Sequence, residues 1–478
     1  MPTYTVTPQD VLFFRDGRPM TANAGSGGHG ARWPEPSIIF DALHSALHRA
    51  FPAKERGQFQ AWEHSHFFGR NGRYPARGDD SKRTHRFGSL ATVGPFPSLA
   101  GAWLFPCPAD VTQRDSAAPD LLPLQERQGQ CNLPQPALYP VVSSAEHDKE
   151  GPSAWWNKSA IERYLGEKPT AEPLQLADDD IMGGEWNIGI EIDSATESTG
   201  RGAAAGKIYA AQYLRLREGV TMGVHAQMPV ATGKPASTVE ALKELFPEDG
   251  ILICGGQRRA CQVHETPQFG AEKVLPRSAA VTGRRVKWLL LSPAVFPAIS
   301  NLDGHGALKR DRNGQPIAAH PGGWLPNWIE PITGQVLLKK GRLRGGSGLR
   351  ENRRAHIQSL GFIDCRLVAA CVAKPIPITG WSERLHLIDE PNEDDPTRKT
   401  KGARPTLLAV PAGATYYFEG PDAATLSDAL SWHGSRAENP SHDRVLNRRS
   451  GLLGEKGFGL GVCGPWQFFE EASKTPTT

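Results

Sequence analysis

The clearest periodic pattern of hydrophobic and polar positions lies in residues 36–51. Pro36 suits the first turn of a helix, and Pro52 would stop it. Polar side chains such as Asp41 and His44 fall on the other side of the helical wheel. The apolar positions share one face at helical spacing and are Ile39, Leu43, Ala46, Leu47 and Ala50. The pattern predicts an amphipathic helix.

Alternating or short apolar runs predict the strands of the first half. We expect residues 208–217 and 220–228 to pair as a hairpin, joined at Glu218-Gly219. A capping box predicts a helix over residues 237–246. The other predicted strands of this half are 3–7, 186–192 and 251–254. Without its insertions the half reads β-α-β-β-α-β, the order of a ferredoxin-like unit.

The second half repeats this order with its first helix unclear. A helix is predicted over residues 422–432, and strands over 286–291, 365–378, 407–418 and 465–469. We therefore predict an α+β protein with two ferredoxin-like (RRM-like, βαββαβ) folds in tandem. The first domain is expected to span 1–270, with an insertion at about 108–180. The second is expected to span 280–478, with an insertion at about 301–360 and a Gly-rich loop at 451–464.

Charge is unevenly distributed along the 478 residues, although the net charge is only +3. Residues 101–200 contain 6 Lys/Arg and 17 Asp/Glu, whereas the rest of the chain contains 48 and 34. Such asymmetry is typical of a basic ligand surface beside an acidic surface for protein partners, or simply of two differently solvated faces.

Cysteine spacing and hydropathy exclude several classes of protein. None of the seven cysteines forms a CxxC pair, so the usual zinc knuckle is not expected and no metal or cofactor is predicted. The N-terminal sequence has no signal-peptide pattern, and the apolar runs are far shorter than the ~20 residues of a membrane span. We expect a cytoplasmic protein with reduced thiols and no membrane contact.

The Gly-rich segment near the C-terminus is the first candidate for binding an anion or RNA. Glycine lets the backbone approach a ligand closely, Lys456 supplies charge, and Phe458 supplies a ring for stacking. Gly457, Gly459 and Gly461 complete the candidate loop. The alternative is a flexible turn between a helix and a strand.

Two arginine-bearing turns are the next candidates. Gly255-Gly256-Gln257-Arg258-Arg259 follows a predicted strand, so Arg258 and Arg259 could reach a phosphate. An Asp-Gly turn at residues 16–17 would present Arg15 and Arg18 together, unless Asp16 pairs with one of them. Solvated arginine turns are the alternative.

Histidines provide the only hint of catalysis. His44 and His48 are four residues apart on the polar face of the predicted helix, and His64 and His66 follow. A metal or nuclease site is conceivable, but there is no HExxH motif, so surface histidines are favoured.

Taken in order, the motifs resemble the RAMP superfamily of CRISPR-associated proteins. Within that superfamily, the sequence resembles the third subunit of the type III-B (Cmr module) effector complex. The motifs are VLFFRDGRP, a Gly-rich loop, WPEPS, IGIEID, GKIYAAQYLRL, LICGGQRR, TGWS, RPTLLAVPAGATYYFEG and GFGLGVCGPW. One departure is Gln257, where the resemblance leads us to expect an acidic residue.

The resemblance implies a non-catalytic RNA-binding subunit that serves antiviral defence. Its two ferredoxin-like folds would hold the 5′ tag of the CRISPR RNA. It would contact the large polymerase-like subunit and the backbone RAMP subunit. The RNA-facing residues that the motifs imply are Arg15, Arg18, Arg258, Arg259, Lys456, Gly457, Phe458, Gly459 and Gly461.

Three alternatives remain open. The chain could be a RAMP endoribonuclease that matures CRISPR RNA, with His44 or His48 as general base. It could be the equivalent subunit of another type III subtype. It could also be a protein scaffold whose basic loops are incidental.

Overall fold

The fold is described from a computed structural model of the chain. The described residues are 3–14, 27–28, 30–50, 90–114, 116, 118–128, 132–145, 151–169, 171–190, 192–193, 197–199, 208–227, 245–246, 249–266, 270–302, 306–310, 316–341, 359–379, 381–382, 402–403 and 406–472. The mixture of helices and strands confirms the α+β class.

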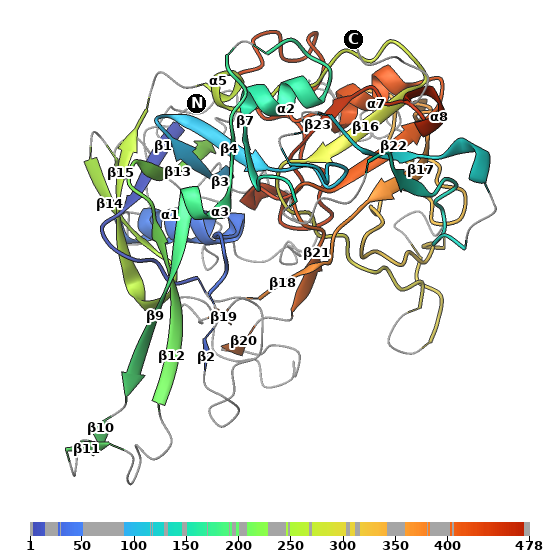
Figure 1. Ribbon diagram of the computed structural model, residues 1–478. Helices are drawn as coiled ribbons and strands as arrows, with labels where there is room; N and C mark the ends of the chain where they lie inside the picture. The colour runs from blue at the N-terminus through green and yellow to red at the C-terminus, as the bar shows by residue number, and fades with distance from the viewer. Residues whose placement is uncertain are drawn as a thin grey trace, which may run out of the picture.

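An eight-stranded sheet organises the N-terminal half, in the order β14-β15-β1-β13-β3-β4-β7-β8 (Figure 1). Its strands are β1 (Thr3–Pro8), β3 (Ala91–Leu99), β4 (Ala102–Pro106), β7 (Trp155–Asn157), β8 (Gln175–Leu176), β13 (Val220–Gln227), β14 (Asp249–Cys254) and β15 (Arg259–Glu265). Helix α1 (Pro36–Ala50) confirms the predicted helix. Its apolar stripe, including Ile39, Leu43 and Leu47, is buried in one core with Val224 and Leu252 of the sheet.

The predicted hairpin between residues 208–217 and 220–228 is wrong. β12 (Ile208–Leu216) pairs with β9 (Met182–Ile190) and β2 (Gly27–Gly28), whereas β13 pairs with β1 and β3. The physical reason is burial. β13 buries Met222 and Val224 on one face and His225 on the other, which suits a strand inside the main sheet between β1 and β3.

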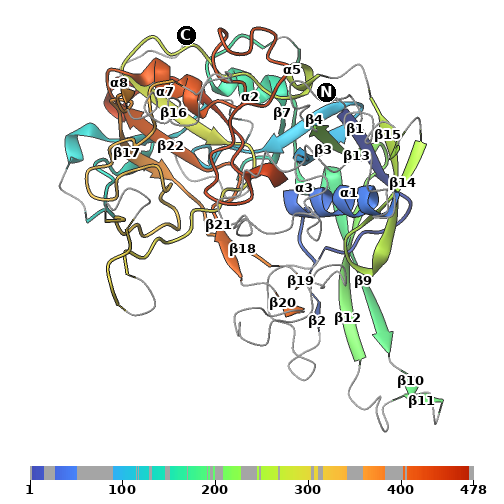
Figure 2. The same ribbon diagram turned by 180° about the vertical axis from the view of Figure 1, so that it is seen from behind.

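The β9–β12 ribbon projects away from the body of the molecule (Figures 1 and 2). Near its tip lies the small pair β10 (Ile192–Asp193) and β11 (Ser198–Thr199). One face of β9 carries exposed apolar side chains, namely Trp186, Ile188 and Ile190.

The C-terminal half contains a four-stranded antiparallel sheet in the order β17-β22-β16-β23. Its strands are β16 (Arg285–Leu290), β17 (Arg366–Cys371), β22 (Thr415–Glu419) and β23 (Gly461–Gly464). Helix α7 (Ala423–Leu430) packs Leu426 and Leu430 against Trp288 and Tyr416 of this sheet.

The predicted last strand, 465–469, is also wrong. β23 ends at Gly464, and α8 (Phe469–Ala472) begins where that strand was expected to finish. Pro465 has no N–H for a strand ladder. The rings of Trp466 and Phe468 are both buried in a cluster with Tyr139.

Shorter elements complete the fold. The helices are α2 (Lys158–Tyr164), α3 (Asp178–Ile181) and α5 (Ala271–Val274). The 3₁₀ turns are η4 (Gln125–Arg127), η6 (Gly256–Arg258) and η7 (Gly454–Lys456). The remaining strands form the pairs β5 (Leu121–Pro123) with β6 (Val141–Ser143), β18 (Ile376–Ile378) with β21 (Leu407–Ala409), and β19 (Trp381–Ser382) with β20 (Gly402–Ala403).

Part of the acidic segment 101–200 joins the two halves. Figure 1 shows its cyan and teal stretch running from the first half to the second. The buried carboxylate of Asp110 accepts hydrogen bonds from the hydroxyls of Tyr164 (2.8 Å) and Tyr417 (2.7 Å). Buried Lys287 of β16 lies over the Tyr164 ring, with Nζ 3.5 Å from the ring centroid. Residues of the segment predicted as an insertion therefore belong to the core between the halves. The domain boundaries themselves stay a prediction.

Within the described part of the chain, no helix combines the length and the hydropathy that a membrane crossing requires.

Candidate RNA-binding surface

The loop at residues 255–259 connects β14 to β15 through the turn η6. Its backbone is left-handed at Gly255 (φ +71°), Gln257 (+57°) and Arg258 (+52°). The Gly256 N–H donates to the Phe13 carbonyl oxygen at 2.8 Å, and a Cβ on Gly255 would lie 2.7 Å from that same oxygen. The two glycines therefore allow the segment that leads into the FRDGRP motif to pack against this loop.

The two arginines of the loop have different environments. The Arg259 guanidinium lies 5.0 Å from the Tyr213 ring centroid, 3.7 Å from Asp10 Oδ2 and 3.0 Å from Gln257 Oε1, to which it donates. The Tyr213 hydroxyl also donates to Gln257 Oε1, at 2.8 Å. Gln257 thus holds Arg259 through an amide oxygen. Arg258 is exposed to solvent.

Arg15 and Arg18 lie outside the described residues, so their predicted contact with RNA stays a prediction. The preceding residue, Phe14, is buried beside Gly255. The chain at Phe14 thus leads into the FRDGRP motif directly beside the arginine loop. No pattern in the sequence indicated that these two motifs meet.

The C-terminal Gly-rich loop packs onto α1. Lys456 Nζ forms an ion pair with Asp41 Oδ1 at 2.6 Å and lies 5.0 Å from the Phe40 ring centroid. Only 12% of the Lys456 side chain is exposed. The Phe458 ring is completely buried beside Val295 and Ile378. The Phe458 ring therefore has no exposed face for the base stacking expected from the sequence, and Lys456 is held by a carboxylate.

The glycines of this loop are required by the packing of the chain on itself. A Cβ on Gly459 (φ +75°) would lie 2.1 Å from the Ser450 nitrogen, and one on Gly461 would lie 2.1 Å from Trp288 Nε1. At Gly457 (φ +99°) the nearest atom would be the Thr92 carbonyl oxygen, at 3.1 Å. The Gly459 N–H already donates to the Pro293 carbonyl oxygen at 2.7 Å. The loop thus closes the contact between the halves, and its predicted contact with RNA stays a prediction.

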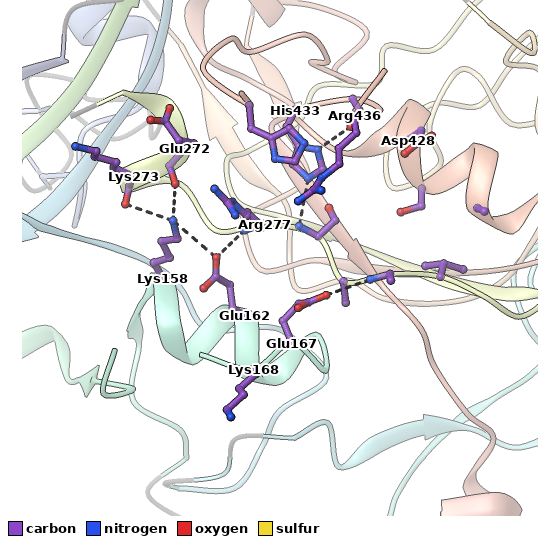
Figure 3. A pocket seen from close by; sticks show the side chains of 18 residues that line it. Lys158, Glu162, Glu167, Lys168, Glu272, Lys273, Arg277, Asp428, His433 and Arg436 are labelled. Atoms are coloured by element: carbon purple, nitrogen blue, oxygen red, sulfur yellow. Dashed lines mark hydrogen bonds and ion pairs between the residues drawn. The ribbon is translucent and has the colours of Figure 1, made fainter. Parts of the chain in front are cut away.

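A cleft of about 1040 Å³ lies between α2, the segment 270–281 and the loop after α7 (Figure 3). Its lining carries both signs of charge. The carboxylates of Glu162 and Glu167 accept backbone N–H groups from Arg277 (3.0 Å) and Ala280 (3.3 Å). A lining of mixed charge does not favour a polyphosphate chain, which needs neutralising cations.

Of the four histidines that the sequence groups together, His44 is the one whose side chain the structure describes. The His44 ring is stacked on Phe40, with centroids 5.8 Å apart and an interplanar angle of 13°. The His48 side chain, His64 and His66 lie outside the described part of the chain. The residues that the structure describes contain no group of three or more side chains able to hold a metal ion.

Comparisons with known proteins identify the family. Searching the curated proteins returned no match. A chain of the cryo-EM structure of the Type III-B Cmr-beta bound to cognate target RNA and AMPPnP is 13% identical, with a TM-score of 0.36, covering 87% of this chain and 86% of the other. A chain of the crystal structure of the Csm3-Csm4 subcomplex in the type III-A CRISPR-Cas interference complex is 10% identical, with a TM-score of 0.32, covering 88% and 94%. The family described as CRISPR-associated protein (Cas_Cmr3) matches residues 4–466. The resemblance predicted from the motifs is thus confirmed, and the chain belongs to the Cas_Cmr3 family of CRISPR-associated proteins.

Proposed function

We propose that this chain is a non-catalytic RNA-binding subunit of a type III-B CRISPR effector that acts in antiviral defence in the cytoplasm. It holds the 5′ tag of the CRISPR RNA and bridges the large polymerase-like subunit to the backbone RAMP subunits. The observation that carries this proposal is the family match over residues 4–466.

The order of the strands supports a tandem ferredoxin-like architecture. Strands β1, β3, β13 and β15 lie in the order β15-β1-β13-β3, with α1 between the first two in the chain. Strands β16, β17, β22 and β23 lie in the order β23-β16-β22-β17, with α7 before the last. Both follow the order 4-1-3-2 of a split βαβ sheet, and the second lacks its first helix among the described residues.

Exposed Arg258, beside the start of the FRDGRP motif, supports an RNA contact. The contacts that hold the turn are made by Arg259, Gln257 and Tyr213. The exposed Arg258 guanidinium can therefore approach a phosphate. Arginine suits this role because its planar fork binds phosphate in a bidentate manner.

The cleft of Figure 3 supports a role in protein contacts. Both signs of charge on its lining complement a protein surface better than they complement RNA. We assign it to contacts with the other subunits of the effector.

RNA binding by the full chain tests the proposal. We expect the chain to retain tag-bearing CRISPR RNA at about 50 mM salt. The binding affinity should fall steeply by about 200 mM salt, because formation of phosphate contacts releases counterions. Copurification from cells should recover the RNA together with the large subunit and the backbone subunit. RNA retention that depends neither on salt nor on the tag, with no copurifying subunit, would contradict the proposed function.

A nuclease assay separates the proposal from the endoribonuclease alternative. A labelled repeat RNA should stay intact with the purified chain, with or without Mg²⁺. Specific cleavage that disappears in the double variant His44→Ala, His48→Ala would establish the alternative, since loss of an acid–base group lowers rates by about 10²–10⁴-fold.

A further inference from the structure

A small cavity of about 220 Å³ lies where the N-terminal end of α1 meets the second half. Its walls are mostly rings and prolines, with Leu291 and Ile376 contributed by the C-terminal half. The N-terminal half contributes Trp33, Pro36, Pro95, Phe96 and Trp155. The cavity is smaller than the ~300–1,000 Å³ of a typical small-molecule site, so it suits one ring system rather than a whole nucleotide.

The walls of the cavity are held in place. The Trp33 indole N–H donates to the Pro95 carbonyl oxygen at 2.8 Å. The Trp33 ring meets the Trp155 ring edge-on, with centroids 5.7 Å apart. The Trp155 indole N–H in turn donates to Asp178 Oδ1 at 2.8 Å. A flat ligand would therefore bind in a preorganised cavity.

Glu35 is the only charged residue among those that line this cavity. Within the described residues its carboxylate has no hydrogen bond or ion pair. The charged groups near it in the chain are engaged elsewhere: Arg32 with Asp178, and Asp41 with Lys456. Burial raises the pKa of the Glu35 carboxyl to about 7. A half-buried carboxylate beside apolar walls, with no donor among the described residues, favours a ligand that brings N–H groups.

An unstacked nucleobase combines a flat ring with N–H donors on its edge. Guanine presents N1–H and N2–H side by side, which matches the two oxygens of a carboxylate. Cytosine and adenine present one amino group beside a ring acceptor. Uracil presents a single N–H between two carbonyl oxygens, which repel a carboxylate. The chemistry of the cavity therefore favours guanine.

We propose that this cavity receives one unstacked guanine base of the bound RNA, with Glu35 accepting hydrogen bonds from N1–H and N2–H. This rests on the proposed RNA-binding function. The main competitor is an aromatic side chain of a partner subunit, which offers at most one donor. The bidentate pair needs ionised Glu35, so guanine affinity should rise as the pH rises.

Free nucleotides and the full chain provide the first arm of the test. Binding of GMP, AMP, CMP and UMP is measured by equilibrium dialysis at pH 6 and pH 8. We expect GMP to bind most tightly, with its affinity rising roughly tenfold between these pH values as Glu35 ionises. Glu35→Ala should abolish the preference for GMP, and Glu35→Gln should abolish the pH dependence. Glu218→Gln, in the exposed turn between β12 and β13, is the matched control and should change neither.

Tag-bearing RNA provides the second arm. Each guanine is replaced in turn by inosine, which lacks the N2 amino group. One replacement should weaken retention by the wild type and have no further effect in Glu35→Ala. Equal binding of the four nucleotides, or a GMP preference that survives Glu35→Ala, would overturn the proposal. So would retained RNA with no position coupled to Glu35, which would favour a partner side chain as occupant. A Glu35-dependent GMP preference without RNA retention would sustain the cavity and reject the proposed function instead.

Discussion

Arg258 and Arg259 are adjacent in one motif but have different environments, because Arg258 is exposed and Arg259 contacts Tyr213 and Asp10. Arg258→Ala should weaken RNA binding and reduce the log–log salt slope by roughly 0.7, the value for one phosphate contact of a single strand. Its melting temperature should not change, because the side chain is exposed. Arg259→Ala should instead lower the free energy of unfolding by about 1 kcal/mol, through loss of the contacts with Tyr213 and Asp10.

The comparison needs both measurements on both variants. Filter binding between 50 and 200 mM salt gives the slope, and chemical denaturation gives the stability. Equal loss of RNA binding in the two variants, with equal stability, would show that the contacts of Arg259 do not distinguish it from Arg258.

Gly459 is predicted to serve packing. Gly459→Ala should destabilise the chain by about 1–3 kcal/mol, because a left-handed residue acquires a Cβ that collides with the Ser450 backbone. Gly454→Ala is the matched control within the same loop, where the nearest atom to a new Cβ is Arg448 Cβ at 3.6 Å. Thermal unfolding of both variants decides the point. A Gly459→Ala chain as stable as the control but unable to bind RNA would restore the ligand-facing interpretation.

This loop also shows where residue-level inference from sequence ends. The sequence does not distinguish a glycine that lets RNA approach the backbone from a glycine that lets the backbone pack against Ser450. Burial of Phe458 and the ion pair of Lys456 depend on contacts with Val295 and Asp41, far away in the chain. The family could be predicted because the motifs and their order can be seen directly in the sequence. The partners of each motif could not.

At the scale of elements, the sequence predicts best where an element is self-contained. α1 carries its proline start and its apolar stripe within one segment, so its bounds were predicted almost to the residue. The strands β12 and β13 are adjacent in the chain and look like a hairpin. β13 instead pairs with β1 and β3, which are distant in the sequence, so the adjacency of β12 and β13 does not determine the pairing.

The contact between η7 and α1 should be measurable as a coupled pair. Lys456 and Asp41 come from opposite halves of the chain, and the lysine side chain is mostly buried while the carboxylate is half exposed. A double-mutant cycle with Lys456→Ala and Asp41→Ala should give a coupling of about 1 kcal/mol, the upper end for partly exposed pairs. Chemical denaturation of the four proteins provides the cycle. Additive effects would mean that the ion pair contributes nothing to docking of the loop.

At the scale of the whole molecule, the two halves are joined by polar groups as well as by an apolar core. Asp110 connects the acidic segment to Tyr417 of the second sheet, and Ser278 connects the segment between the halves to the loop after α7. Val93 of β3 and Val462 of β23 share one buried cluster. The halves should therefore unfold together, with a pH dependence set by the buried polar groups.

His433 should make that junction sensitive to acid. Its Nδ1–H donates to the Gly434 carbonyl oxygen at 2.7 Å, and its Nε2 accepts the Ser278 N–H at 3.3 Å, so the neutral ring is required. Burial lowers the pKa of His433 to about 4, below the ordinary 6.5. The unfolded chain therefore gains a proton at a pH where the folded chain does not, and stability is lost as the pH falls from 6.5 towards 4. Relative to His433→Gln, the wild type should lose about 1.5 kcal/mol between pH 6.5 and pH 5. Denaturation curves at each pH measure this, with His264→Gln on β15 as the control. Parallel pH profiles for the wild type and His433→Gln would show that the ring is not the group that titrates.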